Sequence, residues 1–301
     1  MSSALPTRDA IVATAGETIA RGSKSFAAAS RLFDRETRER AWLLYAWCRA
    51  CDDLADGQEL GFASEAVDDP AARLETIRTR TQAALDGKWV GDPAFDALRI
   101  VAAETAMPHR LIWDLVEGFA LDAAGWRPQS IEDLLRYCYH VAGAVGCMMA
   151  VVMGVRPDED AVLDRACDLG IAFQLANVSR DVAEDAAIGR CYLPADWLAE
   201  ADGDPLAVAH RLAALAERYE ASARGGTPAL SLRSAWAVLA AAGIYGDIAR
   251  KVARGDTLEK RVTTSGSEKL GWIFRAYGQA ARRRELYART ERPSDLWTRP
   301  R

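Results

Sequence analysis

The chain has 301 residues, half of them hydrophobic, a formal net charge of -5 and an isoelectric point near 5.4. This composition allows a sizeable core, and the acidic balance argues against a nucleic-acid binder, which normally carries clustered Lys and Arg. The N-terminus does not resemble a signal peptide, and the longest uncharged run, residues 141–155, is shorter than the roughly 20 residues that span a bilayer. We therefore expect a cytoplasmic protein.

Ala, Leu, Glu and Arg recur with helical spacing almost from end to end, and alternating strand patterns are nearly absent. Clusters of Gly, Pro, Asp and Ser interrupt this pattern without forming a long linker. They lie at residues 56–72, 86–94, 125–130, 154–160, 194–205 and 223–231. The sequence predicts an all-α protein with a single domain over residues 1–301, and flexible ends at residues 1–20 and 290–301.

The first chemically suggestive segment is GSKSF, residues 22–26. Ser hydroxyls, backbone N–H groups after a glycine and the charge of Lys24 would suit an anion. The same letters also fit a simple helix start, so the segment is weak evidence when taken alone.

A stronger pattern follows in YAWCRACDDLADG, residues 45–57. Helical spacing places five residues along one stripe, and they are Tyr45, Arg49, Asp52, Asp53 and Asp56. Leu43, Leu44, Trp47 and Cys51 have the spacing of a buried face. The stripe is therefore predicted to border the protein interior.

Small residues recur every four positions in the apolar segment 137–155, at Ala142, Gly146, Ala150 and Gly154. Such a face either lets two helices approach closely or leaves room for a ligand. The pattern favours neither alternative. Beside a phosphate site, room for a ligand would suit a prenyl chain.

A second polar stripe lies in FQLANVSRDVAED, where Gln174, Asn177, Asp181 and Asp185 have helical spacing. A single stripe would most simply be a solvated helix face. Two stripes of Asp, a weak helix former, suggest a compensating ligand, because like charges one turn apart destabilise a helix. Mg²⁺ would provide it, since this ion is held by a few carboxylates, waters and substrate phosphates.

Lys and Arg outnumber Asp and Glu from Arg250 onward, most densely in ARRREL, residues 281–286. This region could face anionic ligands or lipid head groups, although a solvated helix face is the simpler interpretation.

Taken in order, GSKSFAAASRLFD, LYAWCRACDDLADG, RYCYHVAGAVG and LDRACDLGIAFQLANVSRDVAEDAAIGRCYLPADWL resemble the bacterial squalene and phytoene synthase family of head-to-head prenyltransferases. The likeness covers nearly the whole chain and implies an all-α isoprenoid synthase fold around a central cavity. It also implies metal and diphosphate binding, with catalytic roles, for Asp52, Asp56, Asp181, Asp185 and Arg49, and places Asp53 and Asn177 beside them, Asn177 as a metal ligand.

Further substrate contacts follow from the same likeness. The residues implied to contact diphosphate or line its site are Ser23, Ser25, Tyr45, Gln174, Arg180, Tyr192, Tyr245 and Arg261, while Ala142, Val145 and Gly146 would border a prenyl channel. The implied reaction condenses two geranylgeranyl diphosphates through prephytoene diphosphate to phytoene. It would use Mg²⁺ or Mn²⁺ and need no NADPH.

The hydrocarbon product suggests peripheral membrane contact and transfer of phytoene to a desaturase, without nucleic-acid partners. Three alternatives remain open at this point. A squalene or dehydrosqualene synthase would use farnesyl diphosphate, a class I terpene cyclase would share the DDxxD pattern of residues 52–56, and a scaffold would use its acidic faces to bind basic partners without metal.

Overall fold

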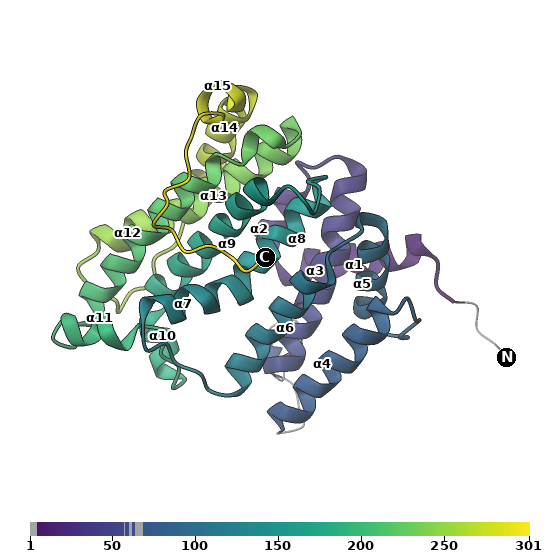
Figure 1. Cartoon of the computed structure of the whole chain (residues 1–301), viewed down its shortest axis with the longest axis horizontal. Coiled ribbons are helices and arrows are strands. Elements are labelled where there is room, and N and C mark those ends of the chain that lie inside the picture. Colours follow the sequence, from purple (N-terminus) through teal and green to yellow (C-terminus); the bar gives the residue numbers. More distant parts are fainter. Residues whose placement is uncertain (1–4, 57, 60–61, 64–68) are drawn as a thin grey trace. The chain divides into compact units, whose positions relative to one another are not determined.

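Helices form nearly all of the regular structure in the computed structural model, which describes residues 5–56, 58–59, 62–63 and 69–301 (Figure 1). The chain divides into two compact units, Met1–Ala123 and Ala124–Arg301. The expected all-α class is confirmed. The expectation of one domain over the whole chain stays a prediction.

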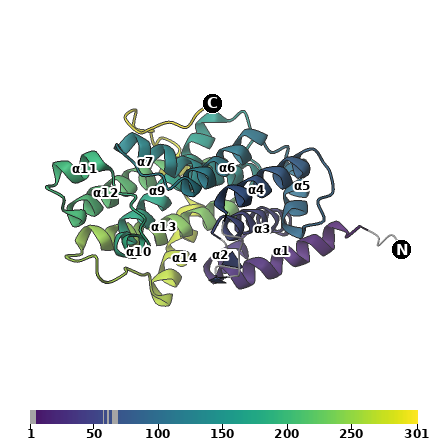
Figure 2. The same cartoon turned by 90° about the horizontal axis from the view of Figure 1, so that it is seen from below.

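The first unit consists of six helices and a short antiparallel pair of strands within its described residues. They are α1 (Arg8–Gly22), α2 (Lys24–Ser30), α3 (Arg35–Asp56), β1 (Gln58–Glu59), β2 (Phe62–Ala63), α4 (Pro70–Leu85), α5 (Pro93–Thr105) and α6 (His109–Ala123). Helix α3 packs against α1, α4, α5 and α6, and Figure 2 shows α1 running beside it. The helix with the first acidic stripe is therefore the centre of this unit.

Local sequence explains where several of these helices begin. Thr7 caps α1, while Asp69 and Asp92 cap α4 and α5, each followed by a proline in the first turn. Ion pairs join α1 and α3 to the end of α5, because Arg8 and Arg40 both bind Glu104, Arg8 at 2.5 Å. The segment that was expected to be flexible, residues 1–20, thus contains a capped and ion-paired helix.

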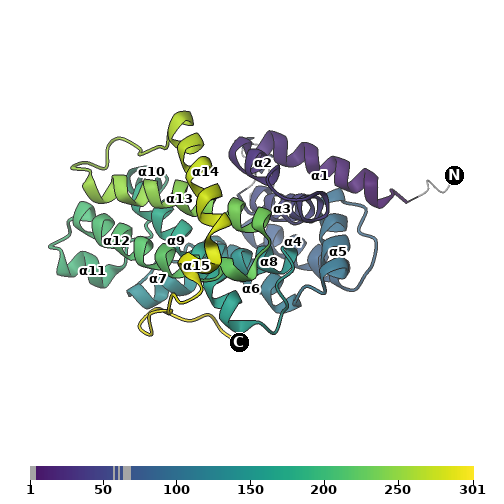
Figure 3. The same cartoon turned by 90° about the horizontal axis from the view of Figure 1, so that it is seen from above.

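The second unit is built around helix α9. Its elements are α7 (Ile131–Cys138), the π-helical turn η1 (Tyr139–Gly143), α8 (Ala144–Val152), α9 (Asp160–Arg180), α10 (Val182–Ala187), α11 (Ala195–Glu200), α12 (Pro205–Arg224), the 3-10 turn η2 (Thr227–Ala229), α13 (Leu232–Arg254), α14 (Gly266–Ala281) and α15 (Arg283–Tyr287). Helix α9 packs against α7, η1, α8, α12 and α13, and α13 in turn packs against α14 (Figure 3).

Two glycines set how closely η1 and α8 cross α9. A Cβ at Gly170 would lie 2.2 Å from the carbonyl oxygen of Ala142, and one at Gly146 would lie 2.3 Å from that of Ala166. Only a hydrogen fits at either position, so Ala142 and Gly146, two of the small residues of segment 137–155, serve close helix packing at this crossing.

The run Ile131–Val152 is, by length and composition alone, apolar enough to cross a membrane. The structure buries 61% of its most apolar window against other parts of the chain. A core helix passes the same test, so this run is weak evidence for a membrane span.

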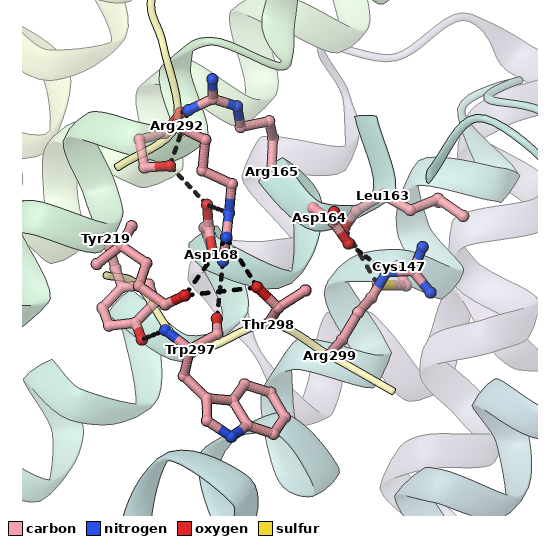
Figure 4. A network of polar contacts seen from close by, with 12 residues as sticks. Cys147, Leu163, Asp164, Arg165, Asp168, Tyr219, Arg292, Trp297, Thr298 and Arg299 are labelled. Carbon is pink, nitrogen blue, oxygen red and sulfur yellow. Dashed lines mark hydrogen bonds and ion pairs between the residues drawn. The ribbon is translucent and has the colours of Figure 1, made fainter. Parts of the chain in front are cut away.

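The C-terminal segment, residues 291–301, lies along α9 and α12 and is held by a polar network (Figure 4). Arg292 donates two hydrogen bonds to the buried carboxylate of Asp168, at 3.0 and 2.9 Å. Arg299, itself buried, pairs with Asp164 at 2.9 Å and also with Asp160. The end of the chain, expected to be flexible, is anchored to α9.

Candidate functional site

Helix α3 carries the whole first stripe, from Tyr45 to Asp56. Leu43, Leu44, Trp47 and Cys51 are buried as the spacing predicted. On the other side, Tyr45, Arg49 and Asp53 are half-buried, while Asp56 is exposed. The helix therefore presents its acids at the boundary between the core and solvent.

Charge compensation within this stripe is uneven. Arg49 donates a hydrogen bond to Asp53 one turn later and so forms an ion pair with it. The pKa of Asp52 is raised to about 7, mainly by loss of hydration and also by the charges of Asp56, Asp53 and Asp122, against the lowering effect of Arg49. Arg49 thus compensates the Asp52 carboxylate only in part, and Asp122 on α6 is a contributor that the sequence pattern did not indicate.

The segment 22–26 lies next to Tyr45. A Cβ at Gly22 would lie 2.6 Å from the Tyr45 hydroxyl oxygen, and the rings of Phe26 and Tyr45 are 5.4 Å apart. The Ser23 hydroxyl accepts a hydrogen bond from the Phe26 N–H at 3.2 Å and so caps α2. The Ser25 side chain lies outside the described residues.

The second stripe begins on α9, where Gln174, Asn177 and Arg180 share a half-buried face. The side-chain amide of Asn177 donates to that of Gln174 at 3.5 Å. The helix ends at Arg180, earlier than the spacing predicted, because Asp181 bends the backbone with ψ near 13°. Asp185 lies on the next short helix, α10. Its backbone N–H still donates a hydrogen bond to the Asp181 carbonyl oxygen at 2.8 Å.

Asp181 is held by two arginines from different parts of the second unit. Arg180 donates through Nε at 2.6 Å and through Nη2, while Arg261 donates through Nε at 2.9 Å and Nη2 at 3.3 Å. Burial by itself would raise the pKa of Asp181, but these hydrogen bonds hold that pKa below its usual value. Glu184, which sequence analysis missed, pairs with Arg261 at 2.9 Å.

Asp185 has the opposite electrostatic environment. Its pKa is raised to about 6, first by loss of hydration and then by the charge of Asp181, against the lowering effect of Arg190. Arginine side chains thus compensate the charge of Asp181 strongly and that of Asp185 only weakly.

Tyr245 and Tyr192 lie in separate aromatic contacts. The ring of Tyr245 stacks on Phe173 of α9 at 4.1 Å, and burial raises the pKa of its hydroxyl. Tyr192 stacks on Tyr137 at 5.1 Å, and Tyr137 stacks on Trp126 at 5.2 Å. Sequence analysis gave no role to Trp126 or Tyr137, because the stack joins residues from three separate segments.

The three residues predicted to border a channel lie at the turn from η1 into α8. Ala142, Val145 and Gly146 are all half-buried. Ala142 and Gly146 contact the α9 backbone, as their glycine-limited crossing requires. Val145 has the largest apolar side chain of this set.

The donor set fits a hard cation that keeps other ligands. Among the described residues, no three His, Cys, Asp or Glu side chains converge to form a metal cage. In the first unit Asp52 and Asp56, and separately in the second unit Asn177, Asp181 and Asp185, carry oxygens of the type that Mg²⁺ accepts. This ion usually completes its shell with water and substrate phosphate. An incomplete protein set is therefore compatible with Mg²⁺.

Comparison with known proteins gives a consistent result. A sequence model described as squalene/phytoene synthase matches residues 19–268. A phytoene synthase of Pseudescherichia vulneris is 47% identical, with 95% of this chain and 97% of that protein covered. A 15-cis-phytoene synthase of a Paracoccus species is also 47% identical, over 96% and 98% of the two chains. Among solved structures, a dehydrosqualene synthase bound to a ligand superposes with a TM-score of 0.79 at 26% identity, covering 91% and 98%.

Proposed function

Because the chain belongs to the squalene/phytoene synthase family and is a prenyltransferase of the 15-cis-phytoene synthase type, we propose that it condenses two molecules of geranylgeranyl diphosphate with the help of Mg²⁺. The product would be phytoene, formed through prephytoene diphosphate with loss of two diphosphates. No reductant enters this sequence, so NADPH is not required.

The observation that carries this proposal is the alternation of carboxylates and guanidinium groups at the end of α9. Asp181 lies between Arg180 and Arg261, and Asp185 follows one helical turn later. Asp181, Asp185 and Asn177 would hold a divalent cation, which would supply charge neutralisation for a diphosphate leaving group. Arg180 and Arg261, which both contact Asp181, would pair with oxygens of the same diphosphate.

The first unit contributes a parallel set of groups on α3. Asp52 and Asp56 would ligate metal, and Arg49 would pair with phosphate while it keeps Asp53 in place. Tyr45 and Ser23, which lie in neighbouring segments, would donate hydroxyl hydrogen bonds to a diphosphate oxygen. In the second unit, Gln174, Tyr192 and Tyr245 would line a substrate site.

The allylic cations of this chemistry must be kept from water. Ala142, Val145 and Gly146 offer an apolar border with no polar side chain, and the stacked rings of Tyr137 and Tyr192 add aromatic surface. We propose that prenyl chains lie against these residues.

The test is incubation of the purified protein with geranylgeranyl diphosphate and Mg²⁺, without NADPH, followed by mass analysis of hexane-soluble products. We expect a forty-carbon product with the phytoene chromophore, and none from Asp52→Ala or Asp181→Ala. Asp158→Ala is the matched control, because this exposed acid lies outside both stripes.

Other outcomes would indicate a different enzyme or a protein without this activity. A product from farnesyl diphosphate alone would indicate a dehydrosqualene synthase, or a terpene cyclase if the product has fifteen carbons. A requirement for NADPH would indicate a squalene synthase. No product from either substrate would favour the metal-independent scaffold.

We also propose that the protein acts in the cytoplasm at a membrane surface, from which a desaturase could take up phytoene. Support comes from α14, where Leu270, Phe274 and Tyr277 are 57%, 76% and 51% exposed at helical spacing, with Arg275 between them. Flotation with phosphatidylglycerol vesicles should recover the wild type and lose a Leu270→Glu, Phe274→Glu variant. Equal recovery would exclude this face, and no flotation of the wild type would exclude membrane contact.

A further inference from the structure

The link between α13 and α14, residues 255–264, crosses beside Asp181 and is fixed at both ends. At its start, the His210 ring nitrogen Nε2 lies 2.9 Å from the carbonyl oxygen of Gly255. At its end, Lys251 donates to the Thr263 carbonyl at 3.1 Å, and Thr264 is buried. Arg261 lies between these fixed points and extends its guanidinium to Asp181.

The two arginines together use the full acceptor capacity of the Asp181 carboxylate. An ionised carboxylate offers about four lone-pair positions. Oδ1 accepts from Nε of Arg180 and from Nε of Arg261, and Oδ2 accepts from Nη2 of each. In this arrangement Asp181 has two positive partners and no lone pair left for a metal ion.

Resting on the proposed metal-diphosphate function, we propose that Arg261 is an exchangeable counter-ion of Asp181, which must leave before Asp181 can ligate a divalent cation. A diphosphate that arrives with the cation offers the released guanidinium a new anionic partner. Arg261 thereby makes metal binding dependent on diphosphate, and protects the acidic site from binding metal alone.

Arg261, rather than Arg180, is the group that exchanges. Its side chain is 47% exposed, against 14% for Arg180, and it lies on a non-helical link instead of a packed helix. Arg180 is the residue directly before Asp181 on the central helix and moves with it. Glu184, 56% exposed, gives Arg261 a second carboxylate on the same side and so a short path away from Asp181.

The proposal predicts that Arg261→Gln changes the affinity for Mn²⁺ in opposite directions in the absence and in the presence of pyrophosphate. Removing the competing charge with Arg261→Gln should tighten binding of Mn²⁺ alone by about two- to fivefold, the value of a partly exposed ion pair. The same change should weaken Mn²⁺ binding in the presence of inorganic pyrophosphate by about tenfold or more, because a charge-assisted hydrogen bond to phosphate is lost. Thermodynamic linkage requires Mn²⁺ to strengthen pyrophosphate binding by the same factor by which pyrophosphate strengthens Mn²⁺ binding, so this factor should fall in Arg261→Gln.

The measurement is a Mn²⁺ titration of the full chain, followed by electron paramagnetic resonance of the free ion, with and without pyrophosphate. Lys260→Gln is the matched control, because it removes the same charge from the neighbouring exposed residue and should change neither affinity. Arg261→Lys keeps the charge but loses the planar fork, so its values should lie between those of the wild type and Arg261→Gln.

Two failures are distinguishable. If the wild type binds Mn²⁺ with pyrophosphate but Arg261→Gln does not bind Mn²⁺ alone more tightly than Lys260→Gln does, the exchange is wrong and the proposed function stands. If neither the wild type nor any folded variant binds Mn²⁺ with pyrophosphate, the metal function itself fails. A melting curve for each variant identifies any that has not folded.

Discussion

Asp185 illustrates the conflict between stability and function at the level of one residue. Its carboxylate lies among Asp181 and Glu184, and its pKa is raised to about 6, so the ionised form that a metal needs is disfavoured in the metal-free fold. A carboxylate in such unfavourable surroundings suggests a functional role that compensates for the loss of stability.

We therefore predict that Asp185→Asn lowers product formation by about 100-fold or more, as loss of an electrostatic catalytic group does. The same variant should melt at a temperature equal to or above that of the wild type, because it removes a like charge. Product assays and calorimetry on the same sample test both statements. A variant that loses activity and also melts earlier would show that Asp185 has a structural role.

Single residues were also where sequence analysis was most successful and most limited. The stripe on α3 was predictable because all its members lie within one helix, and helical spacing fixes which face they share. The contact of Arg261 with Asp181 was not predictable from spacing, since 80 positions separate the two residues in the chain. The bend at Asp181 was missed because a one-residue break keeps the same helical spacing on both sides.

At the level of elements, the crossing of α9 with η1 and α8 depends on the absence of side chains. Sequence analysis left two alternatives for the small residues, close packing or room for a ligand. Gly146 and Gly170 take part in close packing, because any Cβ there would overlap a backbone atom of the facing helix. The pattern could not decide this, since it does not identify the partner helix.

We predict that Gly170→Ala lowers the free energy of unfolding by about 3 kcal/mol, since overpacking against backbone cannot be relieved by a side-chain rotation. Gly271→Ala is the control. It lies within exposed α14, where a Cβ meets no atom within 4 Å, and alanine should stabilise that helix by about 0.5–1 kcal/mol. Urea denaturation of both variants tests the contrast, and destabilisation by both would contradict it.

The start of α14 gives a pH-dependent prediction. Glu268 completes a capping box with Ser265 and pairs with Lys251 at 2.7 Å. The hydrogen bond from Lys251 and those with Ser265 lower its pKa to about 2 from its usual 4.5. Because the pKa is lower in the folded state, ionised Glu268 stabilises the fold above about pH 4.5, and this stabilisation is lost as the pH falls toward 2.

Glu268→Gln should accordingly lower the urea midpoint at pH 7, and the difference from the wild type should be smaller at pH 3.5. Glu259→Gln, an exposed acid that precedes the helix, provides the comparison. A difference that stayed constant between the two pH values would mean that the charge of Glu268 does not contribute.

At the level of the whole molecule, the C-terminal segment connects residues that are distant in sequence. Arg292 and Asp168 are 124 positions apart, and the carboxylate of Asp168 is completely buried. Its pKa is raised by burial despite hydrogen bonds from Arg292 and Ser222, so the carboxylate depends on these partners. Composition and periodicity could not reveal such a pair, which is why the segment was expected to be flexible.

Arg292→Ala should destabilise the protein by about 3–5 kcal/mol, because it leaves a buried carboxylate without its cation. Arg218→Ala serves as control, since it breaks an ion pair with Asp295 whose two side chains are both at least 50% exposed, and should have little effect. Chemical denaturation with both variants decides the matter. Similar midpoints for the two variants would mean that the C-terminal anchor contributes no more than a surface pair.

The same anchor has a consequence for the order in which the protein is made. Arg292 and Trp297 leave the ribosome 124 and 78 residues after their partners Asp168 and Tyr219, and Arg299 likewise follows Asp164 at a long distance in the chain. Domains generally fold as the chain emerges, beginning with the N-terminal part. We therefore expect helix α9 to reach its final packing only after residues 292–299 have left the ribosome, so that a chain truncated before Arg292 would carry unpaired buried charge at the centre of its second unit.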